Sequence, residues 1–286
     1  MKTLMKKAIQ LRMDLLQMIH RANSGHTGGS LSSVDILVAL FYRVMRIDPT
    51  RPLWEERDRF VLSKGHSVEG YYAILADLGF FPKEELERYC RLGSFLTGHP
   101  TRKVPGVEVN TGALGHGLAV GVGMAIAGKM DSKPYKVYVL MGDGELGEGS
   151  VWEAAQVAAH YGLDNLVGIV DRNRLQISGY TEEVLRLENL AEKWRAFGWE
   201  VVNVDGHDLE RLVGTFEKVP ILAKKPHLVL AHTVKGKGVS FIENKKEWHH
   251  HVPSEEELRR ALEELNRQLE ELENDVSKDG YKTCNC

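Results

Sequence analysis

Two polar side chains that could bind a cation each follow a run of apolar residues. Asp143 lies in the turn Gly142-Asp143-Gly144 after the run KVYVLM, and Asn173 follows NLVGIV, 30 positions later. If both runs are parallel strands joined through one helix, the two side chains meet at the carboxyl edge of a sheet. Carboxylate and amide oxygens suit Mg²⁺, which commonly bridges a carboxylate to phosphate oxygens. The spacing therefore predicts a site for Mg²⁺ and a phosphate group.

The same turn has a second interpretation, because segment 142–147 (GDGELG) also matches the G-x-G-x-x-G pattern of dinucleotide-binding loops. The next apolar run even ends in an acid, Asp171. A dinucleotide loop, however, lays backbone N–H groups against a pyrophosphate. Asp143, Glu145 and Glu148 would repel that group unless a divalent cation lay between them. The charges favour the cation site over a nicotinamide- or flavin-binding loop.

Histidine recurs beside glycine in several short motifs. Imidazole titrates near neutral pH and can donate or accept a proton, so a group of histidines suits a reaction that moves hydroxyl protons. Taken singly, each of these histidines would more often be a packed or surface residue. The motifs are NSGHTGG at 23–29, LSKGH at 62–66, TGHP at 97–100, GALGHG at 112–117 and EWH at 247–249.

These motifs lie far apart in the sequence, so the fold must bring them together. From residue 136 onward, β-branched apolar runs alternate with helix-periodic segments, which predicts an α/β fold with a parallel sheet flanked by helices on both faces. A long loop is expected over 93–117. The expected strands are 60–63, 136–141, 165–170, 200–204 and 227–233, and the expected helices are 4–19, 33–45, 67–79, 118–130, 151–161, 189–197 and 208–216.

Together, the turn and the histidine motifs resemble the N-terminal half of transketolase in order and spacing. A Gly-Asp-Gly turn followed 30 residues later by an asparagine is similar to the thiamine diphosphate motif. The resemblance implies a thiamine diphosphate-binding fold, here the domain that binds the diphosphate. It further implies that Asp143, Asn173 and the backbone carbonyl of Leu175 hold Mg²⁺, for which Ca²⁺ or Mn²⁺ could substitute.

The resemblance also gives roles to four histidines. It implies that His66 contacts the diphosphate and lines the reaction centre, while His26 and His99 face substrate hydroxyls. His249 would reach the diphosphate and an oxygen of the donor sugar. Because His249 begins the run His249-His250-His251, this assignment could be shifted by one residue.

Five further positions are expected at the cofactor. Backbone atoms of Gly112, Leu114 and Gly144 would approach it. Ile177 either packs on the thiazolium ring or belongs to the core. Glu148 matches an acidic residue that in the family lies near the subunit interface and links two cofactor sites. Alternatively, Glu148 is a charge at a helix N-terminus, where the helix dipole favours it.

The C-terminal part of the chain is expected to form a helix of its own. Ser254 and Glu257 match a capping box, and leucines then recur at alternating spacings of four and three residues. This helix packs either on its own domain or against another subunit. The chain is thus divided into a single domain over 1–252, an amphipathic helix over 253–275 and a tail over 276–286.

In transketolases the cofactor lies between two domains. The second domain supplies a glutamate and an aromatic side chain for the pyrimidine ring, and basic residues for the sugar phosphate. Only 37 residues follow His249, so we expect this pyrimidine-binding domain to be absent from the chain. The resulting hypothesis is the N-terminal subunit of a split transketolase. It would transfer a two-carbon ketol unit from a ketose phosphate to an aldose phosphate, together with a separate C-terminal subunit in an α2β2 heterotetramer.

Other functions stay open from the sequence. A split ketol transferase with the same cofactor could act on another sugar. 1-Deoxyxylulose-5-phosphate synthase is a more distant relative, whose pattern lacks the SGHTGG stretch seen here. From a different class, the chain could be a non-catalytic scaffold that keeps the fold, although its intact histidines and Mg²⁺ ligands argue against this.

Composition and charge limit the classes of partner and the cellular compartment that the sequence predicts. A formal net charge of −3 gives no basic excess for nucleic acid, and no apolar run approaches the roughly 18 residues of a membrane span. The charged, helix-periodic N-terminus is not a signal peptide. Three cysteines exclude a disulfide framework and fit a cytoplasmic protein. Cys284 and Cys286 could bind a soft metal or form a disordered end.

Overall fold

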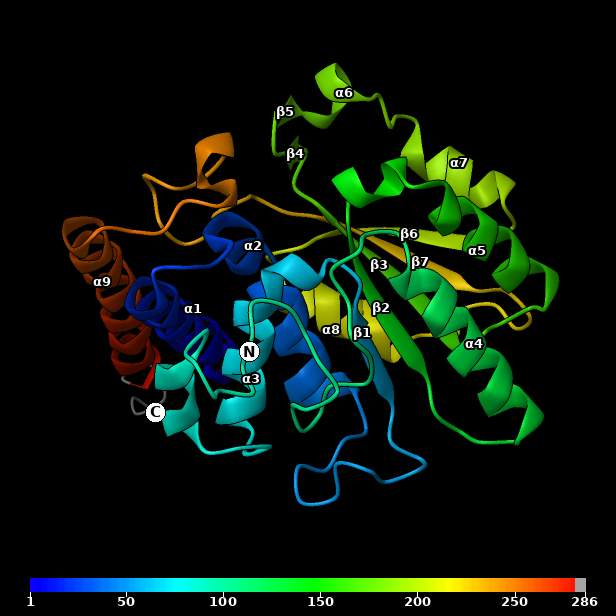
Figure 1. The fold of residues 1–286 in the computed structure, drawn as a ribbon, viewed down its shortest axis with the longest axis horizontal. Helices are drawn as coiled ribbons and strands as arrows, with labels where there is room; N and C mark the ends of the chain where they lie inside the picture. Colours follow the sequence, from blue (N-terminus) through cyan, green and yellow to red (C-terminus); the bar gives the residue numbers. More distant parts are fainter. Residues whose placement is uncertain (281–286) are drawn as a thin grey trace, which may run out of the picture.

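The centre of the molecule is a parallel sheet of five strands. In order across the sheet they are β1 (Arg59–Leu62), β2 (Val137–Gly142), β3 (Leu166–Arg172), β7 (His227–His232) and β6 (Glu200–Asp205) (Figure 1). This computed structural model describes residues 1–280, and the side chains of residues 1–274. The residues of β3 are all buried, as expected for a central strand covered on both faces. The predicted α/β class and parallel sheet are confirmed.

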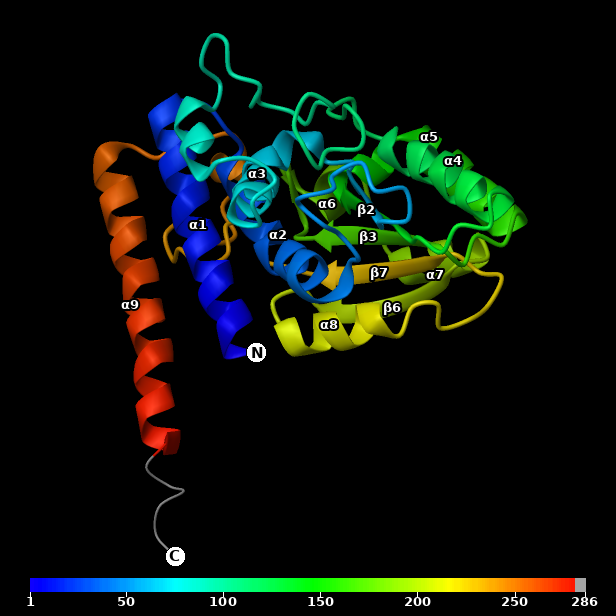
Figure 2. The ribbon, with the colours of Figure 1, turned by 90° about the horizontal axis from the view of Figure 1, so that it is seen from below.

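Helices cover both faces of the sheet, and each face has its own apolar core. One core involves α4 (Gly117–Met130), α5 (Gly149–His160) and α7 (Leu190–Ala196). The other involves α1 (Lys2–Ala22), α2 (Thr27–Ala39), α3 (Val68–Asp77), α8 (Leu209–Glu217) and α9 (Glu255–Gly280). Figure 2 shows α4 and α5 on one side of the sheet and α2 and α8 on the other. No helix among the described residues is long and apolar enough to cross a membrane.

Helix α2 begins at Thr27, directly after His26, rather than near residue 33. Gly28 and Gly29 of the SGHTGG stretch therefore lie inside a helix, where glycine is intrinsically unfavourable. Packing explains their presence, because a Cβ on Gly29 would lie 2.6 Å from the Ser67 hydroxyl oxygen. The helix is also buried along its whole length, so tertiary packing outweighs its weak propensity.

Helix α9 packs along α1 on its own domain, which confirms the first of the two packing interpretations (Figure 2). Ala261 and Leu265 are fully buried in this contact. The predicted capping box is confirmed as well: the Ser254 N–H donates to the Glu257 carboxylate at 2.8 Å, and the Glu257 N–H donates to the Ser254 hydroxyl at 3.3 Å. The helix continues to Gly280, beyond the expected end at residue 275. Cys284 and Cys286 lie outside the described residues.

The carboxyl edge of the sheet collects the loops that carry the predicted site residues. Strands β1, β2, β3 and β7 all end at this edge because they are parallel. Segment 93–116, between η3 and α4, contains no helix or strand, as predicted. The remaining short elements are η1 (Leu40–Val44), η2 (Gly65–Ser67), η3 (Lys83–Arg88), η4 (Gly144–Gly147), η5 (Lys246–His249), α6 (Thr181–Val184), and the hairpin strands β4 (Leu175–Gln176) and β5 (Gly179–Tyr180).

Candidate active site

A cavity of about 430 Å³ lies at this edge of the sheet and brings together most of the predicted site residues. Its walls come from the start of α2, the loops after β1, β2, β3 and β7, and the 112–114 segment. The predicted residues that line it are His26, His66, Gly112, Leu114, Asp143, Gly144, Asn173, Leu175, Ile177 and His249. The further lining residues are Gly29, Lys64, Gly142, Glu145, Gln176, Ser178 and Lys235.

Three imidazoles meet in this cavity. The ring centroid of His26 lies 5.1 Å from that of His66 and 5.7 Å from that of His249. The His66 and His249 rings are stacked with centroids 5.5 Å apart. Burial, with nearby charge, lowers the pKa of His26 to about 4, that of His66 to about 2 and that of His249 to about 3. All three rings are therefore neutral at pH 7, the form in which an imidazole can accept a proton.

The oxygens of the predicted cation site lie on one wall of the cavity. Asp143 is buried, and its carboxylate accepts hydrogen bonds from the Arg174 N–H at 2.6 Å and from Arg172 at 3.2 Å. Burial raises the pKa of Asp143, and the Arg172 guanidinium opposes that rise. The side-chain oxygen of Asn173 accepts from the Leu175 N–H at 3.1 Å, which fixes the amide.

This set of donors fits Mg²⁺ in kind, since a carboxylate, an amide oxygen and a backbone carbonyl are all hard oxygen ligands. The described residues contain no group of three His, Cys, Asp or Glu side chains that could hold a metal. An ion at this wall would thus depend on Asn173 and the Leu175 carbonyl beside Asp143, as the sequence motif implies.

Two buried lysines face the same cavity, and the motifs gave neither of them a role. The Lys64 ammonium pairs with Asp171. Lys235 instead contacts the Leu175 carbonyl at 3.3 Å and the His249 ring at 3.0 Å, and it has no carboxylate partner among the ion pairs of the described residues. Burial, with Lys64 nearby, lowers the pKa of Lys235 to about 8. The carboxylates of Asp143 and Asp171 act on Lys235 only from a longer range. A buried ammonium without a carboxylate in direct contact indicates a place for an anion.

The carboxylates of the glycine-rich turn are arranged differently from the expectation. Glu145 is buried, and its carboxylate accepts hydrogen bonds from the N–H groups of Gly115 at 2.9 Å and Gly142 at 3.1 Å. Glu148 is exposed at the start of α5 and does not line the cavity. Of the three carboxylates expected near the phosphate, Asp143 and Glu145 therefore line the cavity and Glu148 does not.

His99 lies at the margin of the site. Its ring centroid is 6.4 Å from that of His26, and its side chain is exposed rather than part of the cavity wall. The backbone of Gly112 passes so close that a Cβ there would lie 2.4 Å from the His99 ring. Of the consecutive histidines, His249 lines the cavity, whereas His250 is exposed with its centroid 4.5 Å from that of His26.

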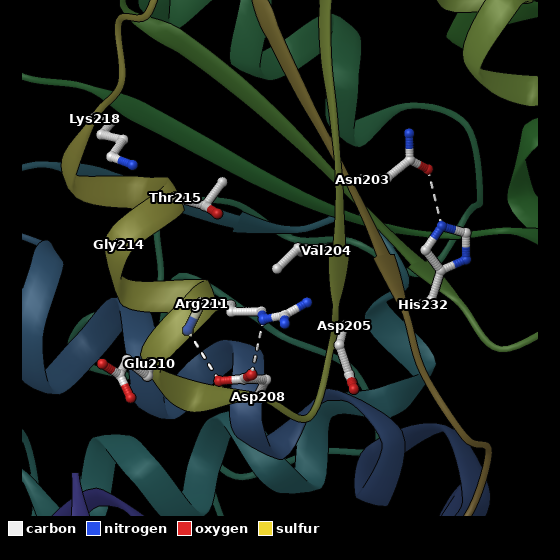
Figure 3. Close-up of a pocket in the computed structure, with 10 residues that line it drawn as sticks. All are labelled: Asn203, Val204, Asp205, Asp208, Glu210, Arg211, Gly214, Thr215, Lys218 and His232. Carbon is white, nitrogen blue, oxygen red and sulfur yellow. Dashed lines mark hydrogen bonds and ion pairs between the residues drawn. The ribbon is translucent and has the colours of Figure 1, made fainter.

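A larger cavity, of about 750 Å³, lies between β6 and α8 and contains none of the predicted residues (Figure 3). In this cavity Arg211 pairs with Asp208, and the His232 ring contacts the Asn203 side chain at 2.9 Å. Three histidines and one lysine whose pKa values are lowered chiefly by burial, His26, His66, His249 and Lys235, line the smaller cavity. We therefore assign the candidate active site to the smaller cavity.

Comparison with known proteins shows the family of this chain. A family model described as the thiamine diphosphate binding domain of transketolase matches residues 3–281. The chain belongs to the transketolase family. This membership excludes the dinucleotide-binding interpretation of the glycine-rich turn, and it identifies the α/β sheet as a thiamine diphosphate-binding fold.

Several relatives have about the same length as this chain. It is 52% identical to one subunit of the apulose-4-phosphate transketolase of Phocaeicola vulgatus, over 91% of this chain and 93% of the relative. It is 44% identical to the 6-deoxy-6-sulfo-D-fructose transketolase subunit SqwG of a Clostridium species, over 91% and 94%.

Other transketolases are much longer. Human transketolase is 40% identical over 87% of this chain, which spans only 40% of that protein. The crystal structure of transketolase from Campylobacter jejuni superposes with a TM-score of 0.82 at 31% identity, covering 97% of this chain and 49% of that one. Transketolase from Leishmania mexicana gives a TM-score of 0.83 at 28% identity, covering 96% and 45%. The chain thus spans less than half the length of these transketolases.

Proposed function

We propose that this protein is the diphosphate-binding subunit of a two-chain transketolase. Together with a separate C-terminal subunit, it would transfer a two-carbon ketol unit from a ketose phosphate to an aldose phosphate. The observation that carries the proposal is the buried Lys235 ammonium. It has no carboxylate in contact among the described ion pairs, it lies beside the Leu175 carbonyl oxygen and the His249 ring, and it shares the cavity with His26 and His66. This combination suits a diphosphate with its cation next to a centre that moves protons.

The residues of the chain fit thiamine diphosphate and Mg²⁺. Asp143, Asn173 and the Leu175 carbonyl would hold Mg²⁺, and Lys64 and Lys235 would offset the remaining negative charge. When bound, thiamine diphosphate supplies the nucleophilic carbon that ketol transfer needs. The remaining contacts with the cofactor would come from backbone groups of Gly112, Leu114 and Gly144 and from the side chains of His66 and Ile177.

The histidines would manage the protons of the substrate. With pKa values near 4 and 3, His26 and His249 are neutral at pH 7 and can accept a proton from a sugar hydroxyl and return it later. His66 shares the cavity, and its neutral ring can donate or accept a hydrogen bond. His99, exposed at the margin, would face a substrate hydroxyl.

The partner is inferred from what the cavity lacks and from the names of the relatives. Ile177 is 74% exposed although it lines the site, so this wall is open in the single chain. A second chain carrying a pyrimidine-binding domain would cover it, and two copies of each chain would form an α2β2 heterotetramer. Glu148, exposed at the start of α5, stays a candidate for a link between two cofactor sites.

The identity of the donor sugar is a separate part of the proposal, and it leaves the type of reaction unchanged. Two relatives are named for apulose 4-phosphate and 6-deoxy-6-sulfo-D-fructose, a phosphorylated and a sulfonated sugar. These names favour an acidic ketose outside the usual pentose and hexose phosphates as the donor.

Reconstitution would test the proposed function. The chain is mixed with its C-terminal partner, thiamine diphosphate and Mg²⁺, and release of aldose is followed with a panel of ketose phosphates and sulfonated ketoses. The proposal expects transfer that depends on both chains, on the cofactor and on the cation. Ketol transfer by the chain alone would contradict the two-chain assembly. A complete complex that binds the cofactor but transfers nothing across the panel would favour the scaffold interpretation.

A further inference from the structure

A wholly buried carboxylate lies directly beneath the histidine cluster. Glu69, in the first turn of α3, has no exposed surface. Its Oε1 atom accepts a hydrogen bond from the backbone N–H of His26 at 2.9 Å and one from the Tyr89 hydroxyl at 2.9 Å. Its Oε2 atom accepts from the Ser30 hydroxyl at 2.5 Å. Glu69 does not line the cavity and was not among the predicted site residues.

Two of the three hydrogen bonds to Glu69 come from the turn that presents His26. His26 is the N-cap residue of α2, and its side chain makes no capping hydrogen bond. In a capping box, a Glu at the third helical position accepts from the N-cap N–H, but that position here is Gly29. Glu69 supplies the missing carboxylate from a different helix and binds Ser30 one residue further along.

The turn is built closely around this carboxylate. Gly25 has a φ of +152°, and a Cβ added there would lie 2.6 Å from the Glu69 Oε1 atom. No lysine or arginine pairs with Glu69 among the described ion pairs, and burial raises its pKa. A buried carboxylate held only by neutral donors is costly for stability. A role at the site would account for that cost better than packing does.

We propose that Glu69 is a positioning residue for the active site, which fixes the His26 imidazole against His66 and His249 through the backbone of the 25–30 turn. The inference rests on the proposed function for its kinetic consequence but not for its structural one. Glu69→Gln would replace one carboxylate oxygen with an NH2 donor, so either the His26 N–H or the Ser30 hydroxyl would face a donor in place of its acceptor, and the start of α2 would be free to shift. A displacement of about 1 Å at a catalytic group can cost about a hundredfold in rate.

The experiment compares Glu69→Gln with a matched control in the same helix. Asp77→Asn, at the other end of α3, also removes a carboxylate that accepts from a tyrosine hydroxyl, that of Tyr42. Imidazole NMR spectra of the full chain are recorded for both variants, with the His26 signal assigned by its loss in His26→Gln. Ketol transfer is then measured in the reconstituted complex, together with the binding of thiamine diphosphate and Mg²⁺.

The proposal expects Glu69→Gln to move the His26 imidazole signal, and Asp77→Asn to leave it in place at a similar loss of stability. It expects kcat to fall by about a hundredfold for Glu69→Gln, with affinity for the cofactor retained. An unmoved His26 signal, or a fall in kcat no larger than that of Asp77→Asn, would overturn it. If Glu69→Gln does not fold, Ser30→Ala and Tyr89→Phe remove one donor each and carry the same test. The NMR result needs no activity, so a failure of the proposed function would leave it interpretable.

Discussion

The sharpest pH-dependent prediction concerns His66, which is partly buried in the site near Lys64. Burial, reinforced by Lys64, lowers the pKa of His66 to about 2 in the folded chain, against an ordinary value of 6.5. The unfolded chain therefore binds a proton below pH 6.5 that the folded chain excludes. Stability from this group is fully present above pH 6.5 and is lost as the pH falls from there toward 2.

The size of the loss follows from this difference. Between pH 7 and pH 5 the unfolded chain gains about 2 kcal/mol from protonating His66, while the folded chain gains almost nothing. Urea unfolding of the chain at the two pH values would measure the loss of stability for the wild type, for His66→Gln and for the exposed control His160→Gln. We expect the loss to be about 2 kcal/mol smaller in His66→Gln than in the other two proteins.

Two results would refute this reasoning. The first is an equal loss of stability in His66→Gln and the wild type between the two pH values. The second is an NMR titration of the folded chain in which the His66 ring protonates near its ordinary pKa of 6.5. Either result would mean that the histidine cluster is hydrated, and the neutral imidazoles of the proposed mechanism would lose their basis.

Three further predictions concern the cavity. Lys235→Met should weaken thiamine diphosphate binding at least about tenfold in calorimetry, because an ammonium without a carboxylate partner is lost. Lys237 is a partly exposed neighbour that pairs with Glu243, and Lys237→Met should leave the binding unchanged. Asp143→Asn should abolish the Mg²⁺ dependence of cofactor binding, and a variant that still responds to Mg²⁺ and to its chelation would contradict the predicted ligand. Gly112→Ala should lower the melting temperature and displace His99, because the φ of Gly112 is +137° and the new Cβ would meet the His99 ring. The control is Gly123→Ala, which has open space around the new Cβ and should stabilise α4 by up to about 1 kcal/mol.

Local sequence patterns predicted the strands of the central sheet well. Each strand near the site is a short apolar run flanked by polar residues, so its position could be inferred without knowing its neighbours. Asp143 and Asn173 were found for the same reason, since each directly follows a strand and the carboxyl ends of parallel strands share one edge. The capping box at Ser254 was equally local.

The features that were missed depend on contacts between distant segments. Lys235 follows the last strand by three residues, and its position at the carboxyl edge was the one available signal. Nothing near Glu69 in the sequence indicates that its carboxylate binds the turn at His26, 43 residues earlier. The early start of α2 likewise depends on how closely Ser67 packs against Gly29.

The central claim is that this chain supplies the diphosphate half of an active site completed by a second chain. Its most direct test is to titrate the C-terminal partner into a fixed amount of this protein, with thiamine diphosphate and Mg²⁺ present, while ketol transfer is measured. We predict no transfer without the partner and a rise that saturates at one partner per chain. Transfer that is independent of the partner, or none at saturation with any ketose in the panel, would contradict the claim.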